Sequence, residues 1–366
     1  MSVPRFEGNV TLVTVARAVG VSPTTVSNAY NRPHKLSAAL RERILEAARD
    51  LGYPGPDPAA RSLRRGRAGS IGLLFGEALT YVFQDPGAVE FLRGLAEGTA
   101  RHNTVLQLIA ALDADGEEDA ASLLANAIVD GLVVWSLPDR HPLLRLARER
   151  NIPLVIHGGP RLDDVPFVGI DDRAAAQAAA EYVLQRGHRS LAVISQPFGP
   201  SRGARHRTPT KIGRPSYRVT RERLAGYRAA ANAATPQPAA LDIYEIAVNS
   251  RDEGQRAALA LLQGTPRPTA VLAMSDELAI GALAAARELN LRVPHDVSVL
   301  GWDDSPSARA GEPALTTIRQ SLYDQGRTCA RLLITATRGE IADDDLVHLA
   351  PWKLITRDST GSPPTH

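Results

Sequence analysis

Residues 11–30 read TLVTVARAVGVSPTTVSNAY, and this stretch decides how the start of the chain folds. Its apolar residues recur at the spacing of one helical face: Leu12, Val15, Ala16 and Val19. Gly20 permits the tight turn that follows. A second helix is expected from about Pro23 to Tyr30, because serine at position 22 is a strong N-cap and proline is favoured at the first helical position. Two short helices joined in this way are typical of a helix-turn-helix.

The second helix of such a motif presents its N-terminal residues to base edges in the DNA major groove. Hydroxyl groups can hydrogen-bond bases or phosphates there, and an asparagine such as Asn28 can pair bidentately with adenine. The expected DNA contacts in this region are Thr11, Ser22, Pro23, Thr24, Thr25, Ser27, Asn28, Asn31 and Lys35. A plain surface role is an alternative for Asn31 and Lys35, and a structural three-helix bundle is an alternative for the whole region.

A third helix is expected over about 37–52, followed by a proline-rich linker at 53–58. The next nine residues read AARSLRRGR. A helix this short is mostly unfolded in water, but a lone leucine among arginines makes sense if the segment folds on DNA. Leu63 would then wedge between base steps while Arg61 and Arg64 line the minor groove.

Charge is unevenly spread along the chain, although the net value is only +2. Residues 1–67 hold 11 Lys and Arg against 5 Asp and Glu, whereas the remaining residues hold 31 against 35. A basic N-terminal module on a mildly acidic body indicates a polyanionic partner. The single cysteine, Cys329, excludes an internal disulfide and a cysteine-rich zinc site.

From residue 70 onward, short apolar runs alternate with helical segments. Examples of the runs are SIGLLF (70–75), GLVVWS (131–136), LAVIS (191–195) and VSVLGW (297–302). Buried strands separated by helices predict parallel sheets covered on both faces, and the length predicts two of them. No strand leads into a phosphate-binding glycine loop, so we expect no cofactor. With neither a signal peptide nor an 18-residue apolar run, the expected location is the cytoplasm.

The run from Val10 to Arg67 resembles the headpiece and hinge helix of the lactose/galactose repressor family, with VARAVGVSPTTVSNAYN and ARSLRRGR as its matching cores. Later stretches, including FVGIDDRAAA, QRGHRSLAVI and PTAVLAMSDELAIGALAAARELNLRVPHDVSVLGWDD, resemble the effector domain of that family. The resemblance implies an all-α helix-turn-helix headpiece plus an α/β periplasmic-binding-protein-like effector domain of two parallel-sheet lobes. It also implies a homodimer, in most cases a repressor, on a pseudo-palindromic operator.

The expected domain organisation follows from this resemblance. We expect a disordered N-terminus at 1–9, the headpiece at 10–55, the linker and hinge helix at 56–68 and the effector domain at 69–366. Within the effector domain, lobe one is expected at about 69–168 and 320–340, and lobe two at about 169–319 and 341–358.

The resemblance also indicates cleft residues, because ligands of open α/β sheets bind at the carboxyl ends of the strands. Arg223 matches the family arginine that binds effector hydroxyls or carboxylates. Asp303 matches the acidic effector ligand, and the adjacent Asp304 is an alternative. The full expected set is Tyr81, Phe83, His157, Arg223, Asn249, Ser275, Asp303 and Gln320.

Structural roles remain alternatives for several of these residues. Arg223 could form an interlobe salt bridge, His157 could be structural, and Tyr81 and Phe83 could pack in the core. The basic stretch 201–223 is interpreted as a solvated, flexible loop, with a disordered lid or a site for an anionic effector as the alternatives.

The sequence therefore predicts a DNA-binding transcription regulator controlled by a sugar, a nucleoside or a sugar phosphate. A solute-binding protein is disfavoured by the fused headpiece. An enzyme is disfavoured because Asp303 and Asp304 abut rather than flank a substrate, and no metal site is expected. The C-terminus lacks a leucine heptad, which favours a dimer over a tetramer. Whether the effector releases DNA or strengthens its binding is left open.

Overall fold

The computed structural model describes residues 10–55, 67–76, 82–110, 117–200, 203–207 and 213–364, with the side chains of 117–120 excepted. The chain divides into two compact units, residues 1–68 and 69–366. The predicted disordered segment at 1–9, most of the predicted hinge helix with Arg61, Leu63 and Arg64, and Tyr81 all lie outside the described residues.

The first unit contains the predicted helix-turn-helix. Its elements are α1 (Leu12–Val19), α2 (Pro23–Asn31), the short 3₁₀ helix η1 (Pro33–Lys35) and α3 (Ala38–Asp50). Each α-helix begins after a side-chain cap, provided by Thr11, Ser22 and Ser37 respectively. Gly20 ends α1 with φ of 75°, a left-handed conformation that glycine adopts without steric cost. A small apolar core joins the three helices: Val15, Ala16, Val26, Ala29, Ile44 and Ala48.

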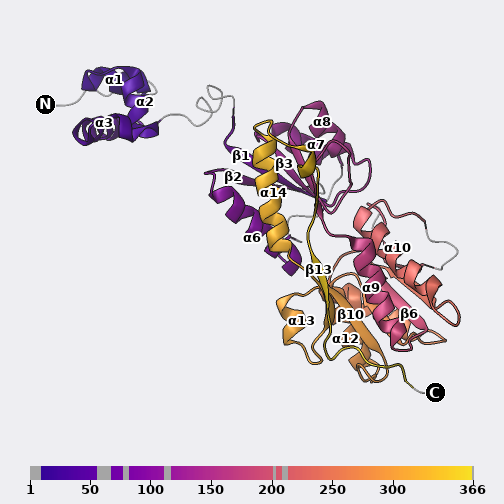
Figure 1. Ribbon diagram of the computed structural model, residues 1–366. Helices are drawn as coiled ribbons and strands as arrows, with labels where there is room; N and C mark the ends of the chain where they lie inside the picture. Colours follow the sequence, from indigo (N-terminus) through magenta and orange to yellow (C-terminus); the bar gives the residue numbers. More distant parts are fainter. Residues whose placement is uncertain are drawn as a thin grey trace. The chain divides into compact units, whose positions relative to one another are not determined.

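The second unit alternates strands and helices, as the sequence predicted (Figure 1). Its first half comprises β1 (Ser70–Phe75), α6 (Pro86–Ala100), β2 (Val105–Ala110), α7 (Glu117–Asn126), β3 (Leu132–Trp135), α8 (Pro142–Glu149), β4 (Leu154–His157) and β5 (Phe167–Gly169). The middle comprises α9 (Asp172–Gln185), β6 (Ser190–Ser195), β7 (Arg205–Arg207), α10 (Arg218–Ala233), β8 (Ala240–Glu245), α11 (Arg251–Leu262), β9 (Ala270–Ala273) and α12 (Asp276–Glu288). The last part comprises β10 (Ser298–Asp303), α13 (Pro306–Ala310), β11 (Thr316–Gln320), α14 (Leu322–Ala336), η3 (Asp343–Asp345), β12 (Val347–Leu349) and β13 (Trp352–Ile355).

Two sheets define two lobes. Lobe one holds a parallel sheet in the order β12-β5-β4-β3-β1-β2. Lobe two holds the order β13-β11-β10-β9-β6-β8-β7, parallel at its centre and antiparallel at its two edge strands, β13 and β7. The predicted pair of parallel-sheet lobes is confirmed, with these two antiparallel edges as an addition.

The chain crosses between the lobes three times: after β5, after β11 and after β12. The last crossing falls later than expected. Residues 341–349 were predicted in lobe two, but β12 pairs in parallel with β5 of lobe one. A three-residue strand with every residue exposed gives too weak an apolar signal to be placed from sequence.

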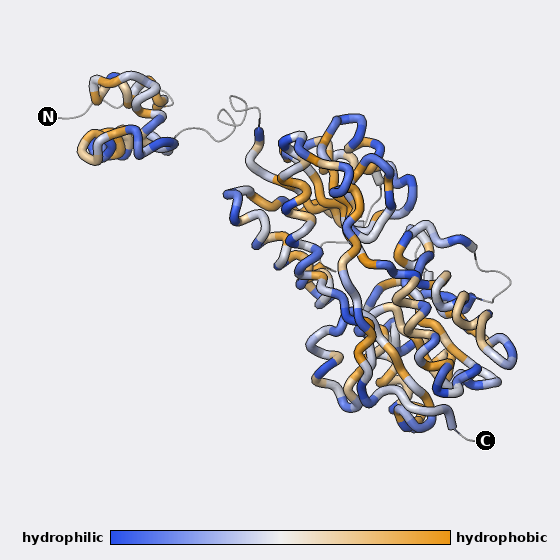
Figure 2. The backbone as a smooth tube through the Cα atoms, in the orientation of Figure 1, coloured by the Kyte–Doolittle hydropathy of each residue, from blue (hydrophilic) through white to orange (hydrophobic). Residues whose placement is uncertain are grey.

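The strands are the most hydrophobic part of each lobe, and helices cover them (Figure 2). Buried residues on both sheet faces form separate clusters, as expected for parallel strands enclosed by helices. Within the described residues, no helix has the length and apolar character that crossing a membrane requires.

Part of the basic stretch 201–223 is ordered at the sheet edge, where β7 pairs with β8. Arg207 donates to Glu245, whose side chain is almost fully buried, and His206 pairs with Asp242 at 2.7 Å. The predicted loop is therefore wrong for 205–207, which form an added edge strand with paired charges, although Arg205 and His206 stay exposed as predicted.

Helices α6 and α14 of lobe one pack at very short range through glycines. A methyl group on Gly94 would lie 1.9 Å from the carbonyl oxygen of Tyr323. We therefore expect Gly94→Ala to lower the stability of the effector domain by about 2 kcal/mol, since overpacking outweighs the gain of about 1 kcal/mol in helix propensity. Urea unfolding followed by circular dichroism measures this. Gly213→Ala is the control, because nothing lies within 4 Å of that position, and equal midpoints for the two variants would contradict the packing argument.

Candidate functional site

The predicted reading helix α2 presents only part of its expected set of contacts. Ser22 accepts a hydrogen bond from the backbone N–H of Thr25 at 3.1 Å, and their hydroxyls lie 2.8 Å apart. Pro23 and Thr24 are exposed beside this cap, and Asn28 is half-buried. Outside α2, Thr11 caps α1 and Lys35 is exposed.

The position of Ser27 differs from the prediction that it contacts DNA. Its side chain is buried, and the Asn31 amide donates to its carbonyl oxygen at 3.0 Å and to its hydroxyl at 3.2 Å. Ser27 lies on the side of α2 that packs into the headpiece, next to the core residue Val26, so it is not presented to DNA. The amide of Asn31 is committed to this internal contact.

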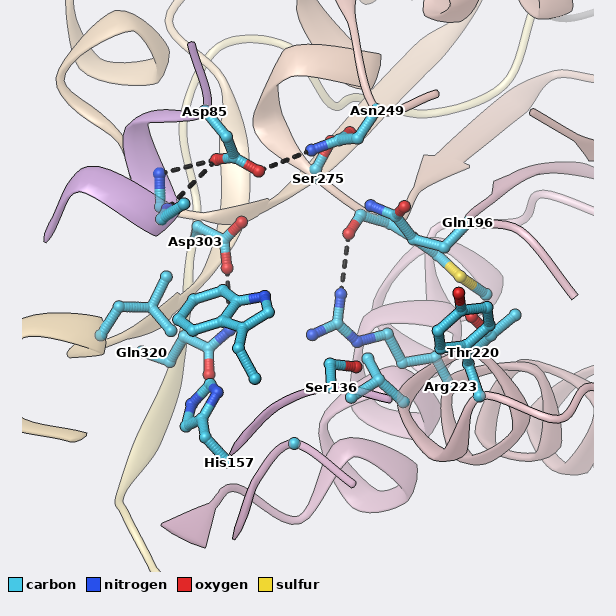
Figure 3. Close-up of a pocket in the computed structure, with 18 of the residues that line it drawn as sticks. Asp85, Ser136, His157, Gln196, Thr220, Arg223, Asn249, Ser275, Asp303 and Gln320 are labelled. Atoms are coloured by element: carbon cyan, nitrogen blue, oxygen red, sulfur yellow. Dashed lines mark hydrogen bonds between the residues drawn. The ribbon is translucent and has the colours of Figure 1, made fainter. Parts of the chain in front are cut away.

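In the effector domain, residues from both lobes enclose a cavity of about 130 Å³. Six of the predicted effector residues line it: His157, Arg223, Asn249, Ser275, Asp303 and Gln320 (Figure 3). Phe83 does not line it. That side chain sits just before the helix cap at Asp85 and is 61% exposed, so the predicted stacking on an effector ring is wrong.

Arg223 is held rigidly at one end of the cavity. Its Nε donates to Asp172 at 3.0 Å, one Nη donates to the Met274 carbonyl at 2.7 Å, and its guanidinium lies 3.8 Å from the ring centre of Trp302. Asp172 and Arg223 both belong to lobe two. The alternative of an interlobe salt bridge is therefore wrong, and the pair fixes the arginine within its own lobe.

A hydrogen-bonded chain runs beside the cavity from lobe one to lobe two. His157 Nε2 lies 2.9 Å from Gln325 Oε1, Gln325 donates to Gln320 at 3.1 Å, and Gln320 donates to Asp303 at 2.8 Å. Because Gln325 uses its amide N–H on Gln320, its oxygen faces His157 and must accept. This places the histidine proton on Nε2. Gln325 was not predicted, since it lies inside α14 and carries no strand-end signal.

His157 is neutral and keeps one acceptor without a protein partner. Burial lowers the pKa of His157 to about 4, and Arg223 lowers it further against the opposing hydrogen bond to Gln325. Within the described residues, its buried Nδ1 has no hydrogen-bond partner. The ring packs against Trp135, with 4.6 Å between ring centres. The structural alternative for His157 thus explains its packing, while Nδ1 has the chemistry of a ligand acceptor.

Asp303 and Asp304 have separate environments, although they are adjacent. Burial raises the pKa of Asp303 to about 6 despite Arg223, and the neighbouring Asp85 raises it further. Asp304 instead contacts three arginines: Arg309 at 3.2 Å, Arg319 at 2.6 Å and Arg357 at 2.6 Å. Asp304 is absent from the cavity lining, so of the two alternatives only Asp303 faces this cavity.

A second polar link joins the lobes at Asp85, which the sequence analysis missed. Asp85 caps α6 of lobe one and accepts a hydrogen bond from the Asn249 amide of lobe two at 3.0 Å. Asn249 Oδ1 in turn accepts from the Ser275 hydroxyl at 2.5 Å. An aspartate before a proline would have indicated the helix cap, but no local pattern indicates its partner in lobe two.

The segment between β6 and α10 closes another side of the cavity. Gln196, Pro197 and Tyr217 from this segment line it. The Asp139 backbone N–H of lobe one donates to the Ser216 carbonyl at 2.8 Å, and the Asp139 carboxylate pairs with Arg221 at 2.8 Å. These contacts attach Ser216 and the start of α10, which carries Arg221, to lobe one. None of them was predicted.

Comparison of this chain with known protein families and solved structures agrees with this architecture. The lacI family of bacterial regulatory proteins matches residues 11–55, and the periplasmic binding protein-like domain matches residues 180–360. An HTH-type transcriptional regulator of Mycobacterium tuberculosis is 39% identical over 343 residues, which is 92% of this chain and 95% of the relative.

Two solved structures extend the comparison over the fold. A LacI-family transcriptional regulator from Corynebacterium glutamicum has a TM-score of 0.73 at 32% identity and covers 96% of this chain and 99% of its own. The complex of the transcriptional regulator CelR with cellobiose has a TM-score of 0.69 at 28% identity, with the same coverage of 96% and 99%.

A helix-turn-helix headpiece joined to a two-lobed domain with a polar cleft defines a DNA-binding transcription regulator with a ligand-binding domain. The chain belongs to the lacI family of bacterial regulatory proteins. The relatives and fold neighbours are transcription regulators and not enzymes, and this protein is likewise a regulator.

The state of His157 can be measured directly. In NMR of ¹⁵N-histidine-labelled protein, we expect its imidazole to carry the proton on Nε2 and to titrate near pH 4, because burial disfavours the charged ring. His157→Gln assigns the signal. Gln325→Leu is the companion variant, because it removes the acceptor that selects this tautomer. A midpoint between about 6 and 7, close to the unperturbed histidine value, would contradict the burial argument.

Proposed function

We propose that the protein represses transcription as a homodimer on a pseudo-palindromic operator, and that a neutral sugar or polyol in the cleft controls it. The observation that carries the ligand class is that buried Arg223 and half-buried Asp303 line one cavity. A guanidinium donates and a carboxylate accepts, and a hydroxyl group can pair with either.

Charge disfavours a phosphorylated effector at this site. Arg223 is already paired with Asp172, while Asp85 and Asp303 both line the cavity. Among the described lining residues, a phosphate would therefore meet two carboxylates and one arginine that is already neutralised. Neutral hydroxyl groups carry no such penalty.

The remaining lining suits a polyhydroxyl ligand. Besides Arg223 and Asp303 it carries amide and hydroxyl groups on Gln196, Thr220, Asn249 and Ser275. Trp135, which lines the cavity, already packs on the His157 imidazole, and this disfavours a flat nucleobase as its stacking partner. CelR, a family relative with this fold, was solved with the sugar cellobiose.

The homodimer is supported by apolar side chains at the β2 edge of lobe one. Val105 of β2 and Ile128 after α7 are each more than 60% exposed, and Val89 of α6 is also exposed. Burial against a second copy would remove this surface from water. Two headpieces would then read two half-sites, and DNA in the cytoplasm would be the partner.

Control by the effector follows from its contacts with both lobes. A ligand between Arg223 of lobe two and His157 of lobe one has a different affinity for open and closed lobes, and it shifts their populations by that difference. The effector would thereby bias the arrangement that binds the operator.

The effector proposal is tested by a thermal-shift screen of the full chain against sugars, polyols and sugar phosphates. We expect a neutral polyhydroxyl compound to raise the melting temperature, because a ligand of the folded state stabilises it. Affinity should fall about tenfold from pH 7 to pH 5, since the pKa of Asp303 is about 6 and only its ionised form accepts two hydroxyls.

In this test Asp303→Asn should bind weakly and without pH dependence, and Arg223→Lys should also bind weakly. Asp163→Asn, an exposed carboxylate between β4 and β5, is the matched control. A sugar phosphate preferred over its neutral sugar, or an unchanged pH dependence in Asp303→Asn, would refute the assignment.

The DNA-reading role of α2 is tested with two asparagines of one helix. After an operator is selected from random DNA, Asn28→Ala should lower operator affinity by about 1–3 kcal/mol while leaving nonspecific binding nearly unchanged, since it removes a base contact. Asn31→Ala is the control. Its amide braces Ser27, so it should lower headpiece stability without changing the ratio of operator to nonspecific affinity. Equal changes of that ratio in both variants would exclude Asn28 as a reading residue.

A further inference from the structure

Asp276, the first residue of α12, carries a buried carboxyl group that the cleft contacts above do not use. It directly follows Met274 and Ser275, which line the cavity between the lobes, and we call this cavity the effector cavity. Asp276 itself is absent from the lining. A buried carboxylate is costly unless its oxygens accept hydrogen bonds, so the partners of Asp276 indicate what it holds in place.

Both oxygens of Asp276 accept hydrogen bonds from neighbouring elements. Oδ2 accepts from the Ser305 backbone N–H at 2.6 Å, and Oδ1 accepts from the Thr317 hydroxyl at 2.7 Å. The Thr317 oxygen accepts in turn from the Asp304 backbone N–H at 3.4 Å. The two backbone N–H groups that follow Asp303 are therefore tied to Asp276, one directly and one through Thr317.

The Asp276 carboxylate also packs against the strand that leads to Asp303. A methyl group on Gly301 of β10 would lie 2.5 Å from Asp276 Oδ1, so only glycine leaves room for the carboxylate at this position. Asp276 thus contacts the chain on both sides of Asp303, at Gly301 before it and at Ser305 after it.

The backbone between these two contacts is strained. Asp303 and Asp304 have φ of 106° and 57°, values that residues with a side chain rarely adopt. Such a conformation persists only where the surroundings hold it. Arginines hold the side chain of Asp304, whereas Asp276 holds the backbone before and after Asp303. Because Asp303 lines the effector cavity, the contacts of Asp276 are placed to control where the Asp303 carboxyl group lies.

The charges of the two carboxyl groups also interact. Burial, and then the charge of Asp303, raise the pKa of Asp276 to about 7 against the hydrogen bonds from Ser305 and Thr317. Asp276 therefore keeps its proton over most of the range in which Asp303, whose pKa is about 6, loses its own. Removing the charge of Asp276 would change the pKa of Asp303 little, whereas displacing Asp303 from its position in the protein would lower it.

We propose that Asp276 is a positioning residue for effector recognition, and that it holds the turn which presents Asp303 to the effector cavity. This rests on the proposed function in one respect, namely that Asp303 binds the effector. Asp276 acts through Ser305 and Thr317 and does not touch the effector. An asparagine at this position can preserve both contacts, because its oxygen accepts from Ser305 and its amide group donates to Thr317. An alanine preserves neither.

Carboxyl ¹³C NMR of the aspartate-labelled full chain, without ligand, tests the proposal. In the wild-type protein Asp303 should titrate near pH 6, and Asp303→Asn assigns its signal. In Asp276→Ala the turn relaxes and the Asp303 carboxyl group gains water, so its midpoint should fall toward the ordinary aspartate value of about 4. In Asp276→Asn the midpoint should stay near pH 6, because both contacts are preserved.

Two further variants complete this experiment. Asp252→Ala removes an exposed carboxylate from the first turn of α11 and should leave the Asp303 midpoint unchanged. Thr317→Val removes the hydroxyl group that joins Asp304 to Asp276 and should lower the midpoint, by less than Asp276→Ala does. If circular dichroism shows that Asp276→Ala does not fold, Thr317→Val decides. An unchanged midpoint in the deciding variant overturns the proposal, as does an equally lowered midpoint in Asp276→Asn.

The panel of sugars and polyols proposed above provides a second measurement. A compound that stabilises the wild-type protein should bind Asp276→Ala at least about tenfold more weakly, the loss expected for one hydrogen bond to a charged group. The same compound should bind Asp276→Asn normally, and equal binding by Asp276→Ala would overturn the proposal. If no compound of the panel stabilises the wild-type protein, the proposed effector class fails, while the carboxyl titration still decides the role of Asp276.

Discussion

The chain of hydrogen bonds from His157 to Asp303 is the constraint on which the cleft depends. It passes through Gln325 and Gln320, and these side chains are buried or half-buried. Each buried polar group left without a partner would cost about 1–3 kcal/mol. The donors and acceptors along the hydrogen-bonded chain therefore have one favourable order. That order sets the tautomer of His157, orients both amides and uses only Oδ1 of Asp303. The polar side chains of the cleft are therefore oriented together by the hydrogen bonds that connect the lobes, and no single residue sets their orientation.

The backbone after β10 separates two carboxylates that the sequence places side by side. Asp303 and Asp304 have φ of 106° and 57°, a region that costs residues with a side chain about 1–3 kcal/mol each. Such strain persists only where the surroundings fix it, and the three arginines around Asp304 do so. The turn places Asp304 among these arginines and leaves Asp303 lining the effector cavity. One strained turn thus supplies an acceptor to the cleft and a buried partner to three arginines.

Features governed by local chemistry could be predicted from the sequence, whereas features governed by packing between lobes could not. Ser22 and Pro23 determine where α2 begins, and the end of β10 places Asp303 at the cleft. Arg223 lies inside α10 and was indicated by the family resemblance. Asp85 and Asn249 are 164 positions apart, and only the approach of the two lobes brings them together. The error at Ser27 has the same cause, since the buried side of α2 depends on its packing with α1 and α3. The sequence left open whether Asp303 or Asp304 faces the cleft, because neither aspartate by itself indicates that the backbone takes a positive φ there.

Two of the groups that would bind an effector, Asp303 and Asn249, also take part in the links between the lobes, and this sets the energy that a ligand must supply. Moving a two-state equilibrium from 1:99 to 99:1 takes about 5.5 kcal/mol of differential affinity. A neutral hydrogen bond contributes about 0.5–1.5 kcal/mol net, whereas one to a charged group contributes about 1.5–3 kcal/mol. Three or so charge-assisted bonds made in only one arrangement would therefore suffice, and Arg223 with Asp303 can provide them to neighbouring hydroxyls. A ligand without hydroxyls would have to disrupt the pairing of Asp85 with Asn249 and gain little in return. Under the proposed function, hydroxyl groups of the effector would be recognised by groups that lie beside the polar links between the lobes.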